Sequence, residues 1–293
     1  MFDRILFPSD GSHGAEIALD HVLDVAEGHG STVHVLNVVD TTLGGATSIT
    51  DAGVDALAAE GEEIVHSAAE EARGRRITVV TEVRQGEPYR TILNYADAEE
   101  VDLIVLPTRG RRGLERFILG STTERVVRAS TVPVLTMQPT MDGDFRYPYR
   151  DVLVPTDGSE CAREALEIGV DIVHDEDATL HVMSVITTTS LGMDVRSDIM
   201  KTELEASAER ILDEAAEYAE TTGVDSLTRA VEYGPSIHKV ILSYIDDRDI
   251  DLVVVGTHGR TGLGRYLIGS VADYLIRTAT IPVLTVRQRE QPS

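Results

Sequence analysis

Two alternating patterns of hydrophobic and polar positions run along the chain. Short runs of consecutive apolar residues predict buried β-strands at 5–8, 32–39, 77–83, 103–106 and 132–136. Apolar residues at helical spacing predict helices between these runs, at 15–26, 51–73, 88–97 and 121–129. Strands that are apolar on both faces and alternate with amphipathic helices indicate a parallel sheet with helices on both sides.

The whole pattern occurs twice. Residues 3–12 match residues 150–159, and residues 101–136 align without gaps with 250–285, where 17 of 36 positions are identical. The offsets are 147 and 149, so we interpret the chain as a tandem duplication. We expect domains at 1–138 and 150–288, a linker at 139–149 and a tail at 289–293. Right-handed crossovers then predict two α/β, doubly wound, Rossmann-like (flavodoxin-like) domains, each with a five-stranded parallel sheet.

The balance of charged residues limits the kinds of partner that the protein can bind. The 293 residues include 26 basic and 50 acidic side chains, for a net charge of −24, and Lys201 and Lys239 are the only lysines. Such a surface repels a nucleic-acid backbone, so we expect no nucleic-acid partner. An acidic, lysine-poor composition resembles that of proteins from salt-loving archaea, which predicts loss of the fold below moderate salt.

Three other classes of protein are disfavoured by the sequence: membrane-spanning, secreted and disulfide-bonded proteins. No apolar run approaches the roughly 18 residues that a membrane span needs. Because the strand pattern starts within the first five residues, we expect no signal peptide. Cys161 is the only cysteine, which excludes an intrachain disulfide and suits a reducing cytoplasm. We expect Cys161 to be a packing residue.

The strongest candidate for a binding site is the loop after the fourth strand of the second half. Glycines lie at 256, 259, 262, 264 and 269, and a predicted helix begins at Ser270. Glycine lets backbone N–H groups approach an anion, and a helix N-terminus adds free N–H groups and a positive dipole end. Arginines outnumber acids in this segment and in its first-half equivalent. The alternative is a surface loop whose arginines pair with neighbouring acids.

An aspartate follows the first strand of each half, Asp10 in Pro-Ser-Asp-Gly-Ser and Asp157 in Pro-Thr-Asp-Gly-Ser. A carboxylate at the carboxyl end of a strand can accept hydrogen bonds from a ribose or a base. Asp-Gly-Ser ahead of a helix is also an ordinary turn and N-cap. The sequence leaves both interpretations open.

The glycine spacing Gly256-x2-Gly259-x9-Gly269-Ser270, combined with Asp157, resembles the ATP-binding branch of the universal stress protein family. The resemblance covers both halves. It implies a tandem protein that binds ATP and has a regulatory role in stress, with Asp157 near the adenosine and the main chain of Val185 near adenine. Any Mg²⁺ or Mn²⁺ would be carried by the phosphates. The candidate nucleotide-binding residues are Pro155, Thr156, Asp157, Val185, Gly256, Gly259, Arg260, Gly262, Gly269 and Ser270.

The first half departs from this pattern, because Pro107 stands where the second half has Gly256. Proline removes an N–H group and fixes φ near −65°, so we expect nucleotide mainly in the second half. A second candidate site consists of Asp10, Val38, Gly110, Gly120 and Ser121.

No Walker-type motif or metal-ligand spacing is present, and His258 in the candidate loop is replaced by Arg109 in the other half, so we name no catalytic residue. A non-catalytic nucleotide-binding protein is therefore favoured. The alternatives are a slow ATPase or phosphate-transfer enzyme and an interaction module that binds no nucleotide. The resemblance also implies pairing of the two domains through 132–136 and 281–286, and further homo-oligomers remain open.

Overall fold

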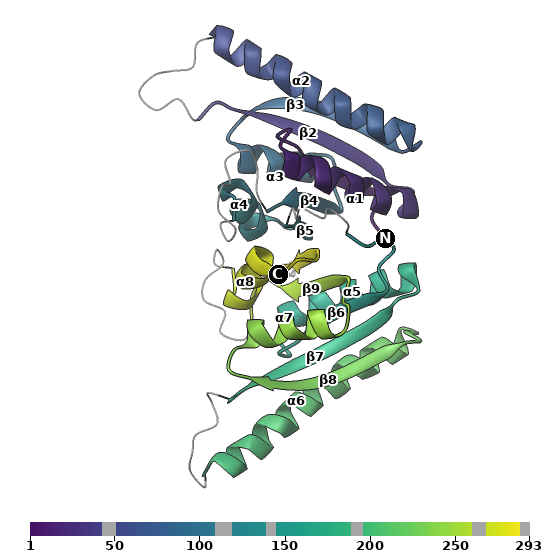
Figure 1. Ribbon diagram of the computed structural model, residues 1–293, viewed down its shortest axis with the longest axis vertical. Coiled ribbons are helices and arrows are strands. Elements are labelled where there is room, and N and C mark those ends of the chain that lie inside the picture. Colours follow the sequence, from purple (N-terminus) through teal and green to yellow (C-terminus); the bar gives the residue numbers. More distant parts are fainter. Residues whose placement is uncertain (43–50, 109–118, 139–144, 189–195, 260–267, 288–293) are drawn as a thin grey trace. The chain divides into compact units, whose positions relative to one another are not determined.

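The computed structural model describes residues 1–42, 51–108, 119–138, 145–188, 196–259 and 268–287 (Figure 1). The chain divides into two compact units, residues 1–148 and 149–293. Within the described ranges, no helix is long and apolar enough to cross a membrane.

The first unit alternates strands and helices in the predicted order. Its elements are β1 (Arg4–Pro8), α1 (His13–His29), β2 (Thr32–Asp40), α2 (Asp51–Gly74), β3 (Thr78–Gly86), α3 (Pro88–Ala98), β4 (Leu103–Pro107), α4 (Ser121–Ala129) and β5 (Val134–Met137). The strands are parallel and follow the order β3-β2-β1-β4-β5. This is the doubly wound, five-stranded arrangement that the sequence predicts.

The second unit repeats the first. Its elements are β6 (Asp151–Pro155), α5 (Glu160–Glu176), β7 (Thr179–Thr187), α6 (Arg196–Thr221), β8 (Leu227–Gly234), α7 (Ile237–Asp247), β9 (Leu252–Gly256), α8 (Ser270–Thr278) and β10 (Val283–Val286). Its parallel strands follow the order β10-β9-β6-β7-β8.

The strand order fixes where a ligand can bind. In each unit the chain starts at the central strand, moves to one edge over the next two strands, and then returns to the other side. Right-handed crossovers place the first two helices on one face of the sheet and the last two on the other. The crevice beyond the carboxyl ends of β1 and β4, or of β6 and β9, is therefore the switch point at which such sheets bind ligands.

The turn after the first strand is built in the same way in both units. Ser12 caps α1 by accepting a hydrogen bond from the N–H of Ala15, and Ser159 caps α5 through Ala162. The carboxylates of Asp10 and Asp157 each accept an N–H bond, from Ser12 and Ser159 respectively, at 3.0 Å. Both aspartates therefore have the structural role in a turn that the sequence left open.

The last four residues of the first unit, 145–148, belong to the segment expected to be a linker, and they pack against α1. The rings of Phe145 and Tyr147 meet the buried His21 edge-on, with centroids 5.6 and 6.1 Å away. Tyr147 also lies close to Gly28, where a Cβ atom would collide with its ring. This part of the connection is therefore docked on a helix.

A buried histidine joins the second strand of each unit to a helix. His34 on β2 lies 2.9 Å from the hydroxyl of Tyr95 on α3, and His181 on β7 lies 3.0 Å from that of Tyr244 on α7. His181 also lies 3.0 Å from Asp151. These polar contacts satisfy groups that would be costly to bury alone, and they hold α3 and α7 against their sheets.

Candidate functional site

The second unit contains a cavity of about 340 Å³ at the carboxyl end of its sheet. Its wall is made by residues from β6, β7 and β9 and by the first residues of α8, and residues of α5 and α7 complete it. The cavity lies at the switch point predicted by the strand order. Eight of the ten candidate nucleotide-binding residues line it, namely Pro155, Thr156, Asp157, Val185, Gly256, Gly259, Gly269 and Ser270. The other two, Arg260 and Gly262, lie outside the described residues.

Part of the cavity wall is apolar. Met183 and Val185 come from the end of β7, while Ile237 and Ile241 come from α7. Ile237 is one of the larger exposed apolar side chains, at 37 % exposure, and it stands at the edge of the cavity. Apolar walls of this kind suit a flat, largely apolar group such as an aromatic base.

Another part of the cavity wall is the N-terminus of α8. Gly269 is the N-cap and has no side chain to bond the first turn, while its own N–H donates to the carbonyl of Thr257 at 2.6 Å. The first three helical N–H groups, of Ser270, Val271 and Ala272, have no acceptor within the helix. All three residues line the cavity, so an anion placed there would meet several donors and the positive end of the helix dipole.

The glycines of the motif allow close packing between elements as well as close approach of a ligand. None of Gly256, Gly259 and Gly269 has a positive φ. A Cβ atom on Gly256 would lie 2.9 Å from the carbonyl oxygen of Cys161, so the end of β9 packs directly on the start of α5. The sequence interpretation, which related this glycine to the close approach of an anion, therefore missed this packing contact.

Gly259 lies close to Asp157, the candidate residue for binding the adenosine. A Cβ atom on it would lie 2.8 Å from Oδ2 of Asp157. Because Oδ1 of Asp157 already accepts the N–H of Ser159, the carboxylate has one oxygen in the turn and the other beside Gly259 at the cavity wall. The structural and the binding interpretations of Asp157 are thus compatible.

Two reactive side chains near the cavity have packing partners. The buried thiol of Cys161 donates to the carbonyl of Val286 at 3.2 Å, which supports its predicted packing role. Nδ1 of His258 lies 3.0 Å from Oγ1 of Thr257. Within the described residues, no group of three or more histidine, cysteine or acidic side chains is placed to hold a metal ion.

In the first unit, the start of α4 has the same geometry as the start of α8 in the second. Gly120 is the N-cap of α4, and its N–H donates to the carbonyl of Thr108 at 2.8 Å, as Gly269 does to Thr257. Asp10, Val38, Gly120 and Ser121 lie at the carboxyl ends of β1 and β2 and at the start of α4. Gly110, the remaining residue of the second candidate site, lies outside the described residues.

The arginines described near these helices pair with acids. Arg128 pairs with Glu124 at 2.7 Å and Arg277 with Asp273 at 2.9 Å. Both pairs lie within helices. The arginines of the loops themselves lie outside the described residues, so both interpretations of the loops stay predictions.

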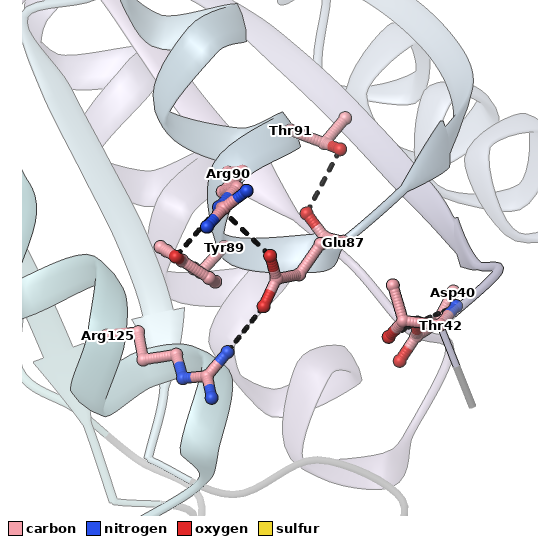
Figure 2. A network of polar contacts seen from close by, with 7 residues as sticks. All are labelled: Asp40, Thr42, Glu87, Tyr89, Arg90, Thr91 and Arg125. Carbon is pink, nitrogen blue, oxygen red and sulfur yellow. Dashed lines mark hydrogen bonds and ion pairs between the residues drawn. The ribbon is translucent and has the colours of Figure 1, made fainter. Parts of the chain in front are cut away.

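A polar cluster joins α3 and α4 in the first unit. Figure 2 shows Glu87, just before α3, between Arg90 and Arg125, with N–O distances of 3.0 and 2.6 Å. The guanidinium of Arg125 also lies 4.9 Å from the centre of the Tyr89 ring. In the second unit, the two helices meet instead through the stacked rings of His238 and Tyr274, 3.8 Å apart.

Comparison with known proteins decides the family. The model of the universal stress protein family matches twice, at residues 1–138 and 148–287. The chain belongs to the universal stress protein family. As a tandem member, it is 30 % identical over 239 residues to a universal stress protein of Mycobacterium tuberculosis, covering 78 % of this chain and 77 % of the relative. A universal stress protein of Methanocaldococcus jannaschii is 31 % identical over 143 residues, covering 48 % of this chain and 83 % of the relative.

The fold agrees with this assignment. The crystal structure of a universal stress protein from Archaeoglobus fulgidus matches with a TM-score of 0.74 and 24 % identity, covering 99 % of this chain and 100 % of that one. The predicted tandem arrangement of two Rossmann-like domains is thereby confirmed.

Proposed function

We propose that the second unit of this universal stress protein binds an adenine nucleotide, ATP in the first place, in a regulatory role without catalysis. The observation that carries the proposal is the cavity of about 340 Å³, whose wall combines apolar side chains with the N-terminus of α8. A volume of this size is typical of small-ligand sites.

The chemical groups that line the cavity fit a nucleotide. The base would lie between Val185 and Ile237, with the main chain of Val185 offering hydrogen bonds at the end of β7. The ribose hydroxyls would meet the carboxylate of Asp157. The phosphates would then lie against Ser270 and the first N–H groups of α8. A divalent cation would enter with the phosphates and would be held mainly by them.

The test is calorimetry with ATP, ADP, AMP and GTP in molar KCl. We expect adenine nucleotides to bind, with an affinity that rises with the number of phosphates and falls for GTP. Replacing Ser270 with alanine removes one donor and should weaken ATP binding by roughly 10- to 100-fold, since a hydrogen bond to a charged group contributes about 1.5–3 kcal/mol. No heat with any of the four nucleotides would contradict the proposal.

The same samples distinguish the enzymatic alternative. Steady release of phosphate from ATP that disappears in Ser270→Ala would indicate a slow ATPase, because phosphoryl transfer needs groups that position water and stabilise the phosphate. We expect bound ATP to remain intact over the time of the titration.

A further inference from the structure

The apolar wall of the cavity, by which we mean Met183, Val185, Ile237 and Ile241, comes from one strand and one helix. Alternate residues of a strand point to the same face of its sheet, so Met183 and Val185 of β7 share one face. Ile237 and Ile241 are four residues apart on α7 and lie on one side of the helix. The apolar wall therefore consists of one face of β7 and one side of α7.

The same face of β7 and the same side of α7 also meet through a buried hydrogen bond. His181 precedes Met183 by two residues on β7, and Tyr244 follows Ile241 by three residues on α7, so both continue the periodicity of the apolar wall. Nδ1 of His181 lies 3.0 Å from the hydroxyl of Tyr244. Each of the two residues is 5 % exposed. The strand and the helix are thus joined first by this polar contact and then, towards the cavity, by the apolar wall.

Asp151, at the start of β6, fixes how His181 takes part in the bond. Nε2 of His181 lies 3.0 Å from Oδ1 of Asp151. A carboxylate only accepts hydrogen bonds, so Nε2 carries the hydrogen, and in the neutral ring Nδ1 then accepts the hydroxyl hydrogen of Tyr244. His181 is therefore held from two sides, and the hydroxyl of Tyr244 donates to an acceptor of fixed position.

The polar contact constrains α7 in a way that apolar packing does not. The hydrophobic effect is non-directional, so the apolar side chains of the wall alone allow α7 to slide or turn on β7. A hydrogen bond requires a narrow range of distance and angle, and a buried polar group left without its partner is costly. The bond between Tyr244 and His181 therefore sets the position of α7 on β7, and with it the separation of the two sides of the apolar wall.

The first unit contains the equivalent bond, which provides an internal reference. Nδ1 of His34 on β2 lies 2.9 Å from the hydroxyl of Tyr95 on α3. Arg4 occupies the position that Asp151 has in the second unit, at the offset of 147 residues. Tyr95 is therefore a matched position at which the same hydroxyl group can be removed far from the second unit in sequence.

We propose that the hydrogen bond from Tyr244 to His181 positions the apolar wall for the base, so that these two residues set the affinity for the adenosine part of the ligand. This inference rests on the proposed function. Neither residue is among those that line the cavity, so both are positioning residues. With the bond in place, a flat base packs between α7 and β7 without a prior rearrangement. Without it, ordering α7 takes up part of the binding free energy.

Removal of one hydroxyl group tests the inference on the full chain. Tyr244→Phe keeps the ring and loses the donor to His181, so we expect the affinities for ATP and for adenosine to fall by the same factor, about two- to tenfold. Ser270→Ala should weaken ATP and leave adenosine unchanged, because Ser270 lies at the start of α8. Calorimetry in molar KCl measures ATP directly and adenosine by its displacement of ATP. The ATP affinity that Ser270→Ala weakens identifies the site of the second unit.

Two further variants complete the test. Tyr95→Phe removes the equivalent hydroxyl from the first unit, and it should lower the midpoint of thermal unfolding about as much as Tyr244→Phe while leaving the affinities of the second unit unchanged. Asp151→Ala changes a partly exposed side chain and releases Nε2 of His181, and it should weaken ATP and adenosine by a smaller factor, about twofold. Thermal unfolding shows that each variant is folded.

The outcomes separate the inference from the proposed function. Adenosine bound as tightly by Tyr244→Phe and Asp151→Ala as by the wild type would overturn the inference and leave the proposed function intact. An equal loss of second-unit affinity in Tyr95→Phe would do the same, because the effect would then follow from a general loss of stability. A wild-type chain that binds no nucleotide would overturn the proposed function and the inference with it.

Discussion

Gly256 lies so close to Cys161 that a Cβ atom on the glycine would stand 2.9 Å from both the carbonyl carbon and the carbonyl oxygen of the cysteine. Real Cβ atoms rarely come so close to backbone, and backbone cannot turn aside as a side chain can. The contact joins the end of β9 to the start of α5, two elements that both contribute to the cavity wall.

We therefore expect Gly256→Ala to destabilise the protein by about 1–3 kcal/mol, as over-packing of a tight interior does. The measurement is the free energy of unfolding from a denaturant titration. Gly74→Ala is the matched control, because nothing lies within 4 Å of its added Cβ and its φ is not positive. The control should be neutral or slightly stabilising. Equal stabilities for the two variants would show that the close approach is not required.

Gly259→Ala should act on binding more than on stability. Its Cβ would lie 2.8 Å from Oδ2 of Asp157, but Gly259 is exposed, so the loop can move away at small cost. That movement displaces the wall beside the carboxylate, and we expect ATP affinity to fall by about tenfold or more, since 1.4 kcal/mol is a factor of ten. Calorimetry measures the affinity, with Gly74→Ala again as the control. Unchanged affinity would place the nucleotide away from this carboxylate.

The docking of residues 145–148 on α1 should depend on pH through His21. Burial lowers the pKa of His21 from 6.5 to about 4, and a backbone hydrogen bond to Phe145 opposes this only in part. Since the neutral form is favoured in the folded state, stability is complete above pH 6.5 and is lost as the pH falls towards 4. The difference of about 2.5 units corresponds to roughly 3 kcal/mol.

The measurement is the free energy of unfolding between pH 4 and 7. The variant His21→Phe should lose less stability across this range than the wild type, whereas His13→Gln, a change at an exposed histidine, should follow the wild type. Parallel curves for His21→Phe and the wild type would contradict the assignment of the acid sensitivity to His21.

The contacts that join the last two helices should respond differently to salt in the two units. Glu87 and Arg125 are partly exposed, so their pair contributes about 0.2–1 kcal/mol and is screened by salt. The stack of His238 on Tyr274 needs no charge. Glu87→Gln should therefore cost less stability in 2 M KCl than in 0.1 M, while the cost of Tyr274→Ala should change little. The same salt dependence for both variants would contradict this difference.

The acidic composition predicts that the stability of the whole chain depends on salt. At a net charge of −24, the acidic side chains repel one another in dilute buffer, whereas at 1 M salt the Debye length is about 3 Å and this repulsion is screened. The midpoint of thermal unfolding should rise markedly between dilute buffer and molar KCl. A midpoint that stays the same would argue against adaptation to salt.

The sequence predicts the fold well, because hydrophobic periodicity and the repeat carry most of the information. Short apolar runs mark the strands, and the offset of 147 places Asp10 and Asp157 at equivalent turns. The motif also brings Gly269 and Ser270 to the start of a helix, as expected. Their role in binding, like the pairing of the two domains through their last strands, stays a prediction.

The details that sequence reasoning missed depend on contacts between distant elements. The reason for Gly256 lies in Cys161, 95 positions earlier, and the reason for Gly61 lies in Asn37 on a neighbouring strand. Comparing the two repeats position by position could have indicated both, because small and large residues are exchanged between the copies. The aromatic residues Phe145 and Tyr147 were a similar signal that the end of the linker packs on a helix.

Cys161 gives the native chain a chemical reporter at a useful place. It is the single thiol of the protein, it is buried, and it lies against Gly256, which lines the cavity. Because its thiol packs against Val286 and Thr257, a thiol-specific reagent reaches it only when this packing opens locally. The rate of modification therefore measures that opening in the unaltered protein, and slower labelling in the presence of a bound molecule would reveal occupancy without any engineered probe.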